Sequence, residues 1–298
     1  MSAEKRTYTY KTVKKHEIRA DVYVAGEGAA RPAIVWIHGG ALIMGHRGGI
    51  AEWQRELYVD AGFTVVSIDY RLAPETKLPA IIDDLQDAFR WVREEGPALF
   101  HADPRRVAAV GHSAGGYLAL MAGVICDPRP AALVSFYGYG DIVGPWYSRP
   151  DPFYCQQPII PRQKAHRAVG REVISGTVGP HKRDDFYVYL RQQGLWPLEV
   201  SGHDPETEPA FFQLYCPVRN VDGEYPPTLL LHGDSDTDVP YAQSAMMAAA
   251  LAKAQVEHEL ITIPGGEHGF DAERNEVAER AFEQVLVFLR RYLGWGGA

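Results

Sequence analysis

The chain has 298 residues, of which 46% are hydrophobic and 23% are charged, and its formal net charge is −8. This composition excludes a disordered protein, and the acidic balance, with a pI near 5.8, offers no basic surface for nucleic acid. No stretch approaches the roughly 20 apolar residues that a membrane-spanning helix needs.

The first thirty residues predict an antiparallel hairpin at a sheet edge, and a regular alternation of elements follows from residue 33. Short apolar runs end at Gly or Asp and are followed by amphipathic stretches. The runs are AIVWIHGG, FTVVSIDY, VAAVGHS, AALVSFYG, PTLLLHGD and, as a near match, EHELITIPG. Their almost continuous apolarity suits strands covered on both faces. The sequence therefore predicts an α/β fold with a mostly parallel central sheet and helices on both faces.

Two stretches between and after these runs carry apolar residues at helical spacing and predict amphipathic helices. The first covers residues 78–95. The second covers residues 273–293, and its expected apolar face consists of Val277, Ala281, Val285, Phe288 and Tyr292.

The alternation breaks between about residues 140 and 225, where Pro, Gly and aromatic residues are frequent. A connection of this length is either a functional lid or disordered, and its many aromatic residues argue against disorder. We predict a single domain over residues 1–298 in which residues 140–225 form an inserted, aromatic-rich cap. Lys182 and Arg183 in this segment could reach an anionic substrate group, although a solvated surface is the favoured interpretation.

The cysteines Cys126, Cys155 and Cys216 lie far apart, with no CxxC spacing and no even count. This pattern argues against a disulfide framework and against a zinc site. The start of the chain is polar and shows no secretory signal, so a cytoplasmic location is expected.

The stretch VAAVGHSAGGYLAL places Ser113 between two glycines, with a strand predicted before it and a helix after it. A lone G-x-S-x-G is a weak signal, but this context is that of a nucleophile elbow. Gly111 and Gly115 suit a strained turn in which strand and helix pass close together. The competing interpretation is a serine that only caps the helix.

A serine nucleophile needs a general base and a carboxylate that orients it, and both are expected later in the chain. His268 follows the last predicted strand and lies among glycines, which favours it as the base. The loop after the preceding strand offers three aspartates, Asp234, Asp236 and Asp238. Asp234 also suits a turn, and Asp238 also suits the N-cap of a helix starting near Pro240.

Acyl transfer through a serine creates an oxyanion, which backbone N–H groups stabilise. Ala114, directly after the nucleophile, is one expected donor. The loop HGGALIMG after the first parallel strand is the expected source of the second. In the other interpretation, HGG is only a turn.

HGG, DYRLAPE (69–75), DDLQDAFRWV (83–92) and GHSAGG (111–116) together resemble the hormone-sensitive-lipase-like branch of the α/β-hydrolase superfamily. The resemblance covers about residues 33–138 and 226–293. It implies an α/β-hydrolase fold and a triad of Ser113, Asp236 and His268, because the acid loop resembles H-G-D-x-D-x-x-V-P. It also implies Gly40, Ala41 and Ala114 as oxyanion donors.

The chain departs from the branch pattern at two positions. Ala41 stands where a third glycine is usual, and His112 stands before the nucleophile where the branch favours Asp. His112 is shared with formamidase-like and peptidase-like relatives, and the acid loop is similar to that of dienelactone hydrolases and prolyl-oligopeptidase-type enzymes. His112 itself is taken to fill a variable position.

The sequence therefore predicts a serine hydrolase that cleaves carboxylic esters with a short to medium acyl chain or an aryl group. No metal or organic cofactor is expected, and the expected partner is a small-molecule ester, with a homodimer possible. The alternatives are an amidase, formamidase or aminopeptidase-type hydrolase with the same triad, and a non-catalytic binding protein on the same fold.

Overall fold

In the computed structural model, which describes residues 4–24, 30–177 and 183–294, eight strands form one sheet in the order β1-β2-β4-β3-β5-β6-β7-β8. They are β1 (Glu4–Val13), β2 (His16–Val24), β3 (Arg31–Ile37), β4 (Thr64–Ile68), β5 (Ala102–His112), β6 (Ala132–Phe136), β7 (Thr228–Gly233) and β8 (His258–Ile263). The β1–β2 and β2–β4 pairings are antiparallel, whereas all pairings from β4 to β8 are parallel. The predicted edge hairpin and mostly parallel sheet are confirmed.

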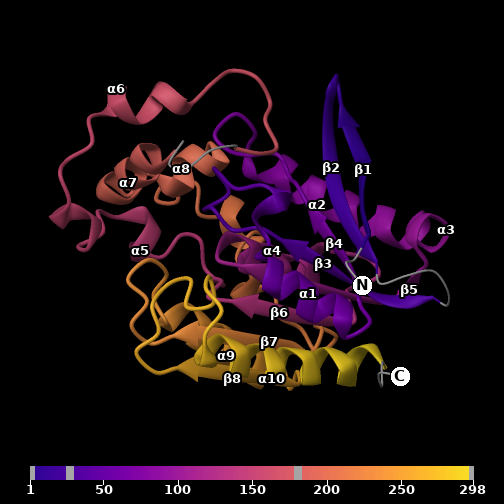
Figure 1. Cartoon of the computed structure of the whole chain (residues 1–298). Helices are drawn as coiled ribbons and strands as arrows, with labels where there is room; N and C mark the ends of the chain where they lie inside the picture. The colour runs from indigo at the N-terminus through magenta and orange to yellow at the C-terminus, as the bar shows by residue number, and fades with distance from the viewer. Residues whose placement is uncertain (1–3, 25–29, 178–182, 295–298) are drawn as a thin grey trace.

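Helices cover both faces of this sheet (Figure 1). The longer ones are α1 (Glu52–Asp60), α2 (Leu78–Glu94), α4 (Ala114–Ile125), α9 (Ala242–Lys253) and α10 (Glu276–Leu293), and a short α3 (Gly96–Phe100) follows α2. In the described residues, no helix has the length and apolarity needed to cross a membrane.

Side chains that alternate along the strands belong to two cores, as the period of a strand requires. On β3, Val35 and Ile37 join a core that contains α2, α4 and α9, whereas Ile34 and Trp36 join a core that contains α1 and α10. The parallel strands β3, β4, β6 and β7 and the C-terminal part of β5 are therefore buried on both sides, which explains their continuous apolar sequences, whereas the edge strand β8 is only partly buried.

The C-terminal helix α10 begins at Asn275, whose side chain accepts a hydrogen bond from the Ala278 amide as an N-cap. Its buried face includes Ala281, Val285 and Phe288, as predicted. Val277 is 49% exposed, so its predicted place on the apolar face is wrong. The core side of the first turn is instead formed by Ala278, one position further on.

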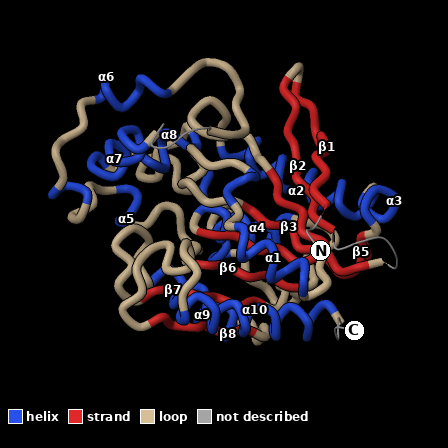
Figure 2. Tube along the Cα trace, in the orientation of Figure 1, coloured by secondary structure: helices blue, strands red, loops and turns tan. Residues whose placement is uncertain are grey.

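Between β6 and β7 the chain forms short helices joined by long loops (Figure 2). The α-helices are α5 (Pro145–Ser148), α6 (Arg162–Ala165), α7 (Asp184–Gln193) and α8 (Trp196–Ser201), with 3₁₀ turns at Tyr154–Gln156, His166–Ala168, Phe211–Gln213 and Pro217–Arg219. Figure 1 shows α5, α6, α7 and α8 gathered at one end of the sheet, and the loop after α6 runs back to the β1–β2 hairpin, where Ser175 Oγ lies 2.9 Å from Nε2 of His16. Aromatic residues form their interior, and the rings of Tyr147 and Trp196 stack at 4.2 Å.

Candidate active site

Ser113 occupies a strained turn between β5 and α4, with φ 55° and ψ −120°. A Cβ on Gly111 would lie 2.0 Å from the carbonyl oxygen of Gly115, and a Cβ on Gly115 would lie 2.0 Å from that of Ile37. Only glycine fits at either position, because strand and helix pass in backbone contact. The Ser113 side chain makes no capping hydrogen bond to α4, which removes the support for the simple capping interpretation.

The loop after β3 lies directly against this turn. A Cβ on Gly39 would lie 3.3 Å from the Cβ of Ser113. Gly40 and Ala41 have φ values of 106° and 53°, a region that L-residues seldom adopt. Among the described residues, the amides of Gly40, Ala41 and Ala114 donate no hydrogen bond to another part of the chain. Three backbone donors are therefore available beside Ser113.

Side chains of the 140–225 segment hydrogen-bond to backbone carbonyl oxygens of the loop after β3. Trp196 donates from Nε1 to the Ala41 carbonyl oxygen at 2.8 Å, and Arg183 donates from Nη1 to the Ile43 carbonyl oxygen at 2.9 Å. Arg183 is only 2% exposed. The solvated surface favoured for it from the sequence is therefore wrong, and its guanidinium instead supports the loop. Lys182 lies outside the described residues.

Asp236 is oriented by its own loop, which leaves β7. One carboxylate oxygen accepts from the amides of Asp238 and Val239, each at 2.8 Å. The other oxygen accepts from Nδ1 of His268 at 2.7 Å. Burial opposes the charge on Asp236, but the hydrogen bonds from His232 and His268 outweigh it and lower the pKa of this carboxyl. Asp236 is therefore ionised and holds the Nδ1–H tautomer of His268.

His232, at the end of β7, supports the same carboxylate from the other side. Its Nε2 lies 2.9 Å from the Val239 carbonyl oxygen, which can only accept, so Nε2 carries the proton. The same N–H lies 3.3 Å from Asp236 Oδ2, and Nδ1 lies 2.7 Å from the hydroxyl oxygen of Ser244. The buried ring of His232 thus contacts Asp236 on the side away from its own loop.

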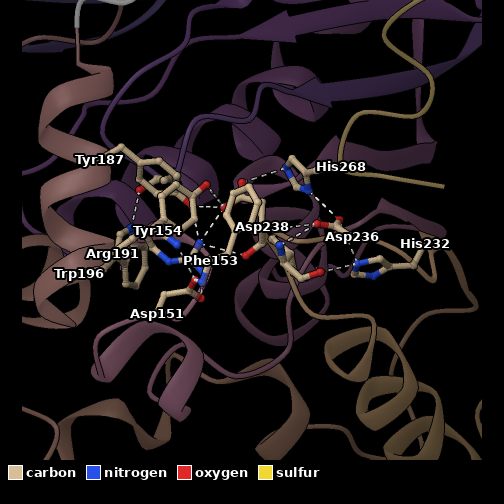
Figure 3. A network of polar contacts seen from close by, with 12 residues as sticks. Asp151, Phe153, Tyr154, Tyr187, Arg191, Trp196, His232, Asp236, Asp238 and His268 are labelled. Carbon is tan, nitrogen blue, oxygen red and sulfur yellow. Dashed lines mark hydrogen bonds and ion pairs between the residues drawn. The ribbon is translucent and has the colours of Figure 1, made fainter. Parts of the chain in front are cut away.

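His268 lies between two carboxylates, as Figure 3 shows. Its Nδ1 is bonded to Asp236, and its Nε2 lies 3.5 Å from Oδ2 of Asp238. Burial disfavours the imidazolium, but the hydrogen bond that His268 donates to Asp236 and the charges of Asp238, Asp236 and Asp271 outweigh burial and raise the pKa of His268. Among the described residues, His268 makes no hydrogen bond with Ser113.

A second buried pair ties the turn at Ser113 to the loop that carries His268. Nε2 of His112 lies 2.9 Å from one carboxylate oxygen of Asp271, and the hydroxyl of Tyr137 donates to the other at 2.7 Å. The Tyr137 ring also lies 4.6 Å from the His268 ring. The sequence does not predict this contact of His112, because no local pattern relates it to Asp271.

Asp238 faces the 140–225 segment. Its Oδ1 accepts from the hydroxyls of Tyr154 and Tyr187 at 2.8 and 2.6 Å and from Nη1 of Arg191 at 2.7 Å. The predicted capping role of Asp238 is wrong, because α9 begins at Ala242 without a side-chain cap. Asp234 lies in a turn, as predicted, and its side chain accepts from the amide of Gly265, in the loop after β8, at 2.6 Å.

The structure thus brings Asp236 and His268 into contact and places both beside the turn that carries Ser113 and the free amides. In residues 4–24, 30–177 and 183–294, no group of three His, Cys, Asp or Glu side chains could hold a metal ion. A family profile described as the alpha/beta hydrolase fold matches residues 34–272.

The chain belongs to the α/β-hydrolase superfamily. The resemblance drawn from its motifs is therefore confirmed, including the likeness to the hormone-sensitive-lipase-like branch. Among curated proteins, this α/β-hydrolase is 30% identical to the non-reducing polyketide synthase ausA of Emericella nidulans, over 98% of this chain and 14% of the synthase. It is also 30% identical to the non-reducing polyketide synthase mapC' of Penicillium brevicompactum, over 93% of this chain and 15% of the synthase. The α/β-hydrolase chain thus spans about a seventh of the length of these relatives.

Solved structures share the fold over almost the whole α/β-hydrolase chain. The thermophilic carboxylesterase EstE1, cloned from a metagenomic library, superposes with a TM-score of 0.74 at 23% identity, over 98% of this chain and 90% of that chain. A bacterial heroin esterase gives a TM-score of 0.73 at 24% identity, over 98% and 85%. A protein of unknown function from Staphylococcus aureus subsp. aureus Mu50 gives 0.80 at 21% identity, over 97% and 99%.

Proposed function

We propose that this α/β-hydrolase is a serine-dependent hydrolase of carboxylic esters. The observation that carries the proposal is the 2.7 Å contact between Asp236 and Nδ1 of His268, on a loop that packs beside the strained turn of Ser113. A buried, ionised carboxylate on Nδ1 holds the neutral ring in the tautomer whose Nε2 is unprotonated, which is the state a general base requires.

In the proposed mechanism, Ser113 Oγ attacks the ester carbonyl carbon while His268 Nε2 accepts the hydroxyl proton. The amides of Gly40, Ala41 and Ala114 donate to the oxyanion, each contributing roughly 3 kcal/mol. His268 then returns the proton to the leaving alcohol, and an acyl-serine remains. Water activated by His268 hydrolyses the acyl-serine. For the first step, Ser113 Oγ and His268 Nε2 must come within hydrogen-bond distance, as catalytic hydrogen bonds often tighten only with substrate bound.

The acyl group is proposed to be short to medium in length, or aryl, because the 140–225 segment presents an aromatic interior beside the loop that carries Ala41. Solved structures of the same fold include carboxylesterases, which supports the ester reaction. A cytoplasmic location, a homodimer and the assignment of residues 140–225 as a cap stay predictions.

A second candidate is an acyl-thioester hydrolase with the same residues. It is favoured by the 30% identity to a segment of polyketide synthases, enzymes that assemble acyl chains as thioesters. Comparing an acetate ester with the corresponding thioacetate separates the two candidates. An aryl ester compared with the matching aryl amide tests the amide hydrolase alternative.

The deciding experiment uses 4-nitrophenyl esters of rising chain length on wild type and Ser113→Ala. The variant should lose about 10³ or more in kcat with an unchanged circular dichroism spectrum. Ser235→Ala, which removes an exposed hydroxyl from the acid loop, should keep its activity. Activity of Ser113→Ala near the wild-type value, or failure of a fluorophosphonate to label the wild type, would overturn the proposal and favour a binding protein.

A further inference from the structure

We infer that Asp238 selects esters whose leaving alcohol carries a hydrogen-bond donor close to the ester oxygen, above all a protonated amine. This inference rests on the proposed ester hydrolysis, because it assigns Asp238 to the part of that active site where the leaving alcohol would bind. It concerns the free oxygen of a carboxylate that the 140–225 segment holds next to His268 (Figure 3).

The orientation of Asp238 is set by contacts that leave it no freedom to turn. Oδ1 accepts three hydrogen bonds, from Tyr154, Tyr187 and Arg191. Arg191 Nη1 also donates to the Asp238 backbone carbonyl oxygen at 2.9 Å. Rotating the carboxylate would break charge-assisted hydrogen bonds to a guanidinium that is 1% exposed. These contacts to Oδ1 therefore also fix the position of Oδ2, on the side of His268.

Oδ2 faces Nε2 of His268 at 3.5 Å, and among the described residues no donor hydrogen-bonds to it. In the neutral ring that acts as the base, Nδ1–H donates to Asp236 and Nε2 presents a lone pair. Two acceptors then face each other with no proton between them. The Asp238 side chain is 20% exposed, so an incoming group can reach its free oxygen. A hydrogen-bond donor is therefore missing beside Oδ2 of Asp238, and a substrate could supply it.

The chemistry of the proposed reaction decides which part of the substrate lies there. His268 Nε2 returns its proton to the leaving oxygen, which must come within about 3 Å of that nitrogen. An oxygen 3.5 Å from Nε2 is then within reach of atoms two or three bonds beyond the leaving oxygen. In the proposed mechanism the amides of Gly40, Ala41 and Ala114 bind the carbonyl oxygen of the acyl group, so the donor belongs to the alcohol.

The charge around Asp238 favours a cation over an anion. Arg191 pairs with both Asp151 and Asp238 at 2.7 Å, so two carboxylates share one guanidinium and the cluster keeps a net negative charge. A protonated amine gains a charge-assisted hydrogen bond there, a hydroxyl gains a weaker one, and a carboxylate is repelled.

The experiment compares 2-(dimethylamino)ethyl acetate, which is protonated at pH 7, with 3-methylbutyl acetate, which has the same shape without the N–H. One charge-assisted hydrogen bond corresponds to a preference of about 10-fold or more in kcat/KM. Hydroxide-catalysed rates of the two esters correct for their intrinsic reactivity. The wild type should prefer the amine ester by this factor, and Asp238→Asn should reduce the preference to about twofold or less.

Asp234→Asn is the matched control, because it removes the same charge from the same loop at an exposed position that contacts Gly265 rather than His268. This variant should keep the wild-type preference. An Asp238→Asn variant that keeps the preference overturns the inference, and so does a wild type that hydrolyses both esters equally. A wild type that hydrolyses neither ester overturns the proposed function instead, and this inference with it.

A second measurement avoids the variant altogether, should Asp238→Asn fail to fold. In wild type, 2-(dimethylamino)ethanol should inhibit hydrolysis of a 4-nitrophenyl ester about tenfold more tightly than 3-methylbutanol. Equal inhibition by the two alcohols would overturn the inference.

Discussion

The loops at the strand ends and the 140–225 segment hold their charged side chains in different ways. In the acid loop, Asp236 is held by amides two and three residues away in the sequence. In the 140–225 segment, Arg191 is held by carboxylates 40 residues before it and 47 residues after it. Asp236 and Asp238 are thus close neighbours in the chain, but Asp236 accepts from amides a few residues away in the sequence, whereas Asp238 accepts from a side chain 47 residues away. Turn chemistry holds Oδ1 of Asp236 and leaves Oδ2 for His268, whereas packing between distant segments holds Oδ1 of Asp238.

The sharpest test of this comparison is Asp236→Asn against Asp238→Asn. Losing the carboxylate on Nδ1 favours the wrong tautomer of His268, so Asp236→Asn should lower kcat by about 10⁴. Asp238→Asn should lower kcat for an uncharged 4-nitrophenyl ester by less than about tenfold. Steady-state kinetics with folding checked by circular dichroism decides the matter, and equal losses in the two variants would mean that the acid is wrongly assigned.

Arg191→Met should destabilise the protein strongly. The guanidinium is buried and pairs with Asp151 and Asp238, so its removal leaves two carboxylates without their shared cation. Breaking a buried pair costs about 3 kcal/mol or more in the free energy of unfolding. Urea denaturation measures this loss in the free energy of unfolding. The control is Arg129→Met, which breaks an exposed ion pair with Asp222 and should cost under about 1 kcal/mol. Similar costs for the two variants would contradict a structural role for the buried network.

Asp271→Asn should weaken the tie between the Ser113 turn and the His268 loop. The buried carboxylate accepts from His112 and Tyr137, and a misplacement of about 1 Å between reacting groups can cost about 10²-fold in rate. We expect kcat to fall by up to that factor while KM stays unchanged, because no contact to the substrate is lost. A rise in KM with kcat preserved would show that Asp271 acts on binding rather than on position.

The smallest expected effect is on the pH profile. His268 acts as a base only when neutral, so kcat/KM should rise with pH through its pKa, which its carboxylate neighbours raise above 6.5. Asp238→Asn removes one of these charges, so the rising limb should move to lower pH. Profiles of an uncharged ester test this shift, and a limb that stays in place would mean that Asp238 exerts no field on Nε2.

The parts predicted well from the sequence are those governed by short-range rules. Strands buried on both faces carry continuous apolar runs, and the glycines around Ser113 reflect backbone contact at 2.0 Å, so both leave a local signature. The contact between His268 and Asp236 agrees with the predicted pair, while its catalytic role stays a prediction. The prediction for the first turn of α10 is wrong by one residue, because it places Val277 on the buried face where the structure has Ala278.

The sheet with its helices on both faces, the tight turn at Ser113 and the three candidate aspartates of the acid loop can all be predicted from the sequence. Three contacts are visible only in the folded chain: Arg183 supports the loop after β3, His112 contacts Asp271, and Asp238 belongs to the network of Arg191. The physical reason is the range of the forces. Backbone sterics and apolar periodicity act over a few residues, whereas a buried charge takes whichever partner the folded chain brings within hydrogen-bond distance.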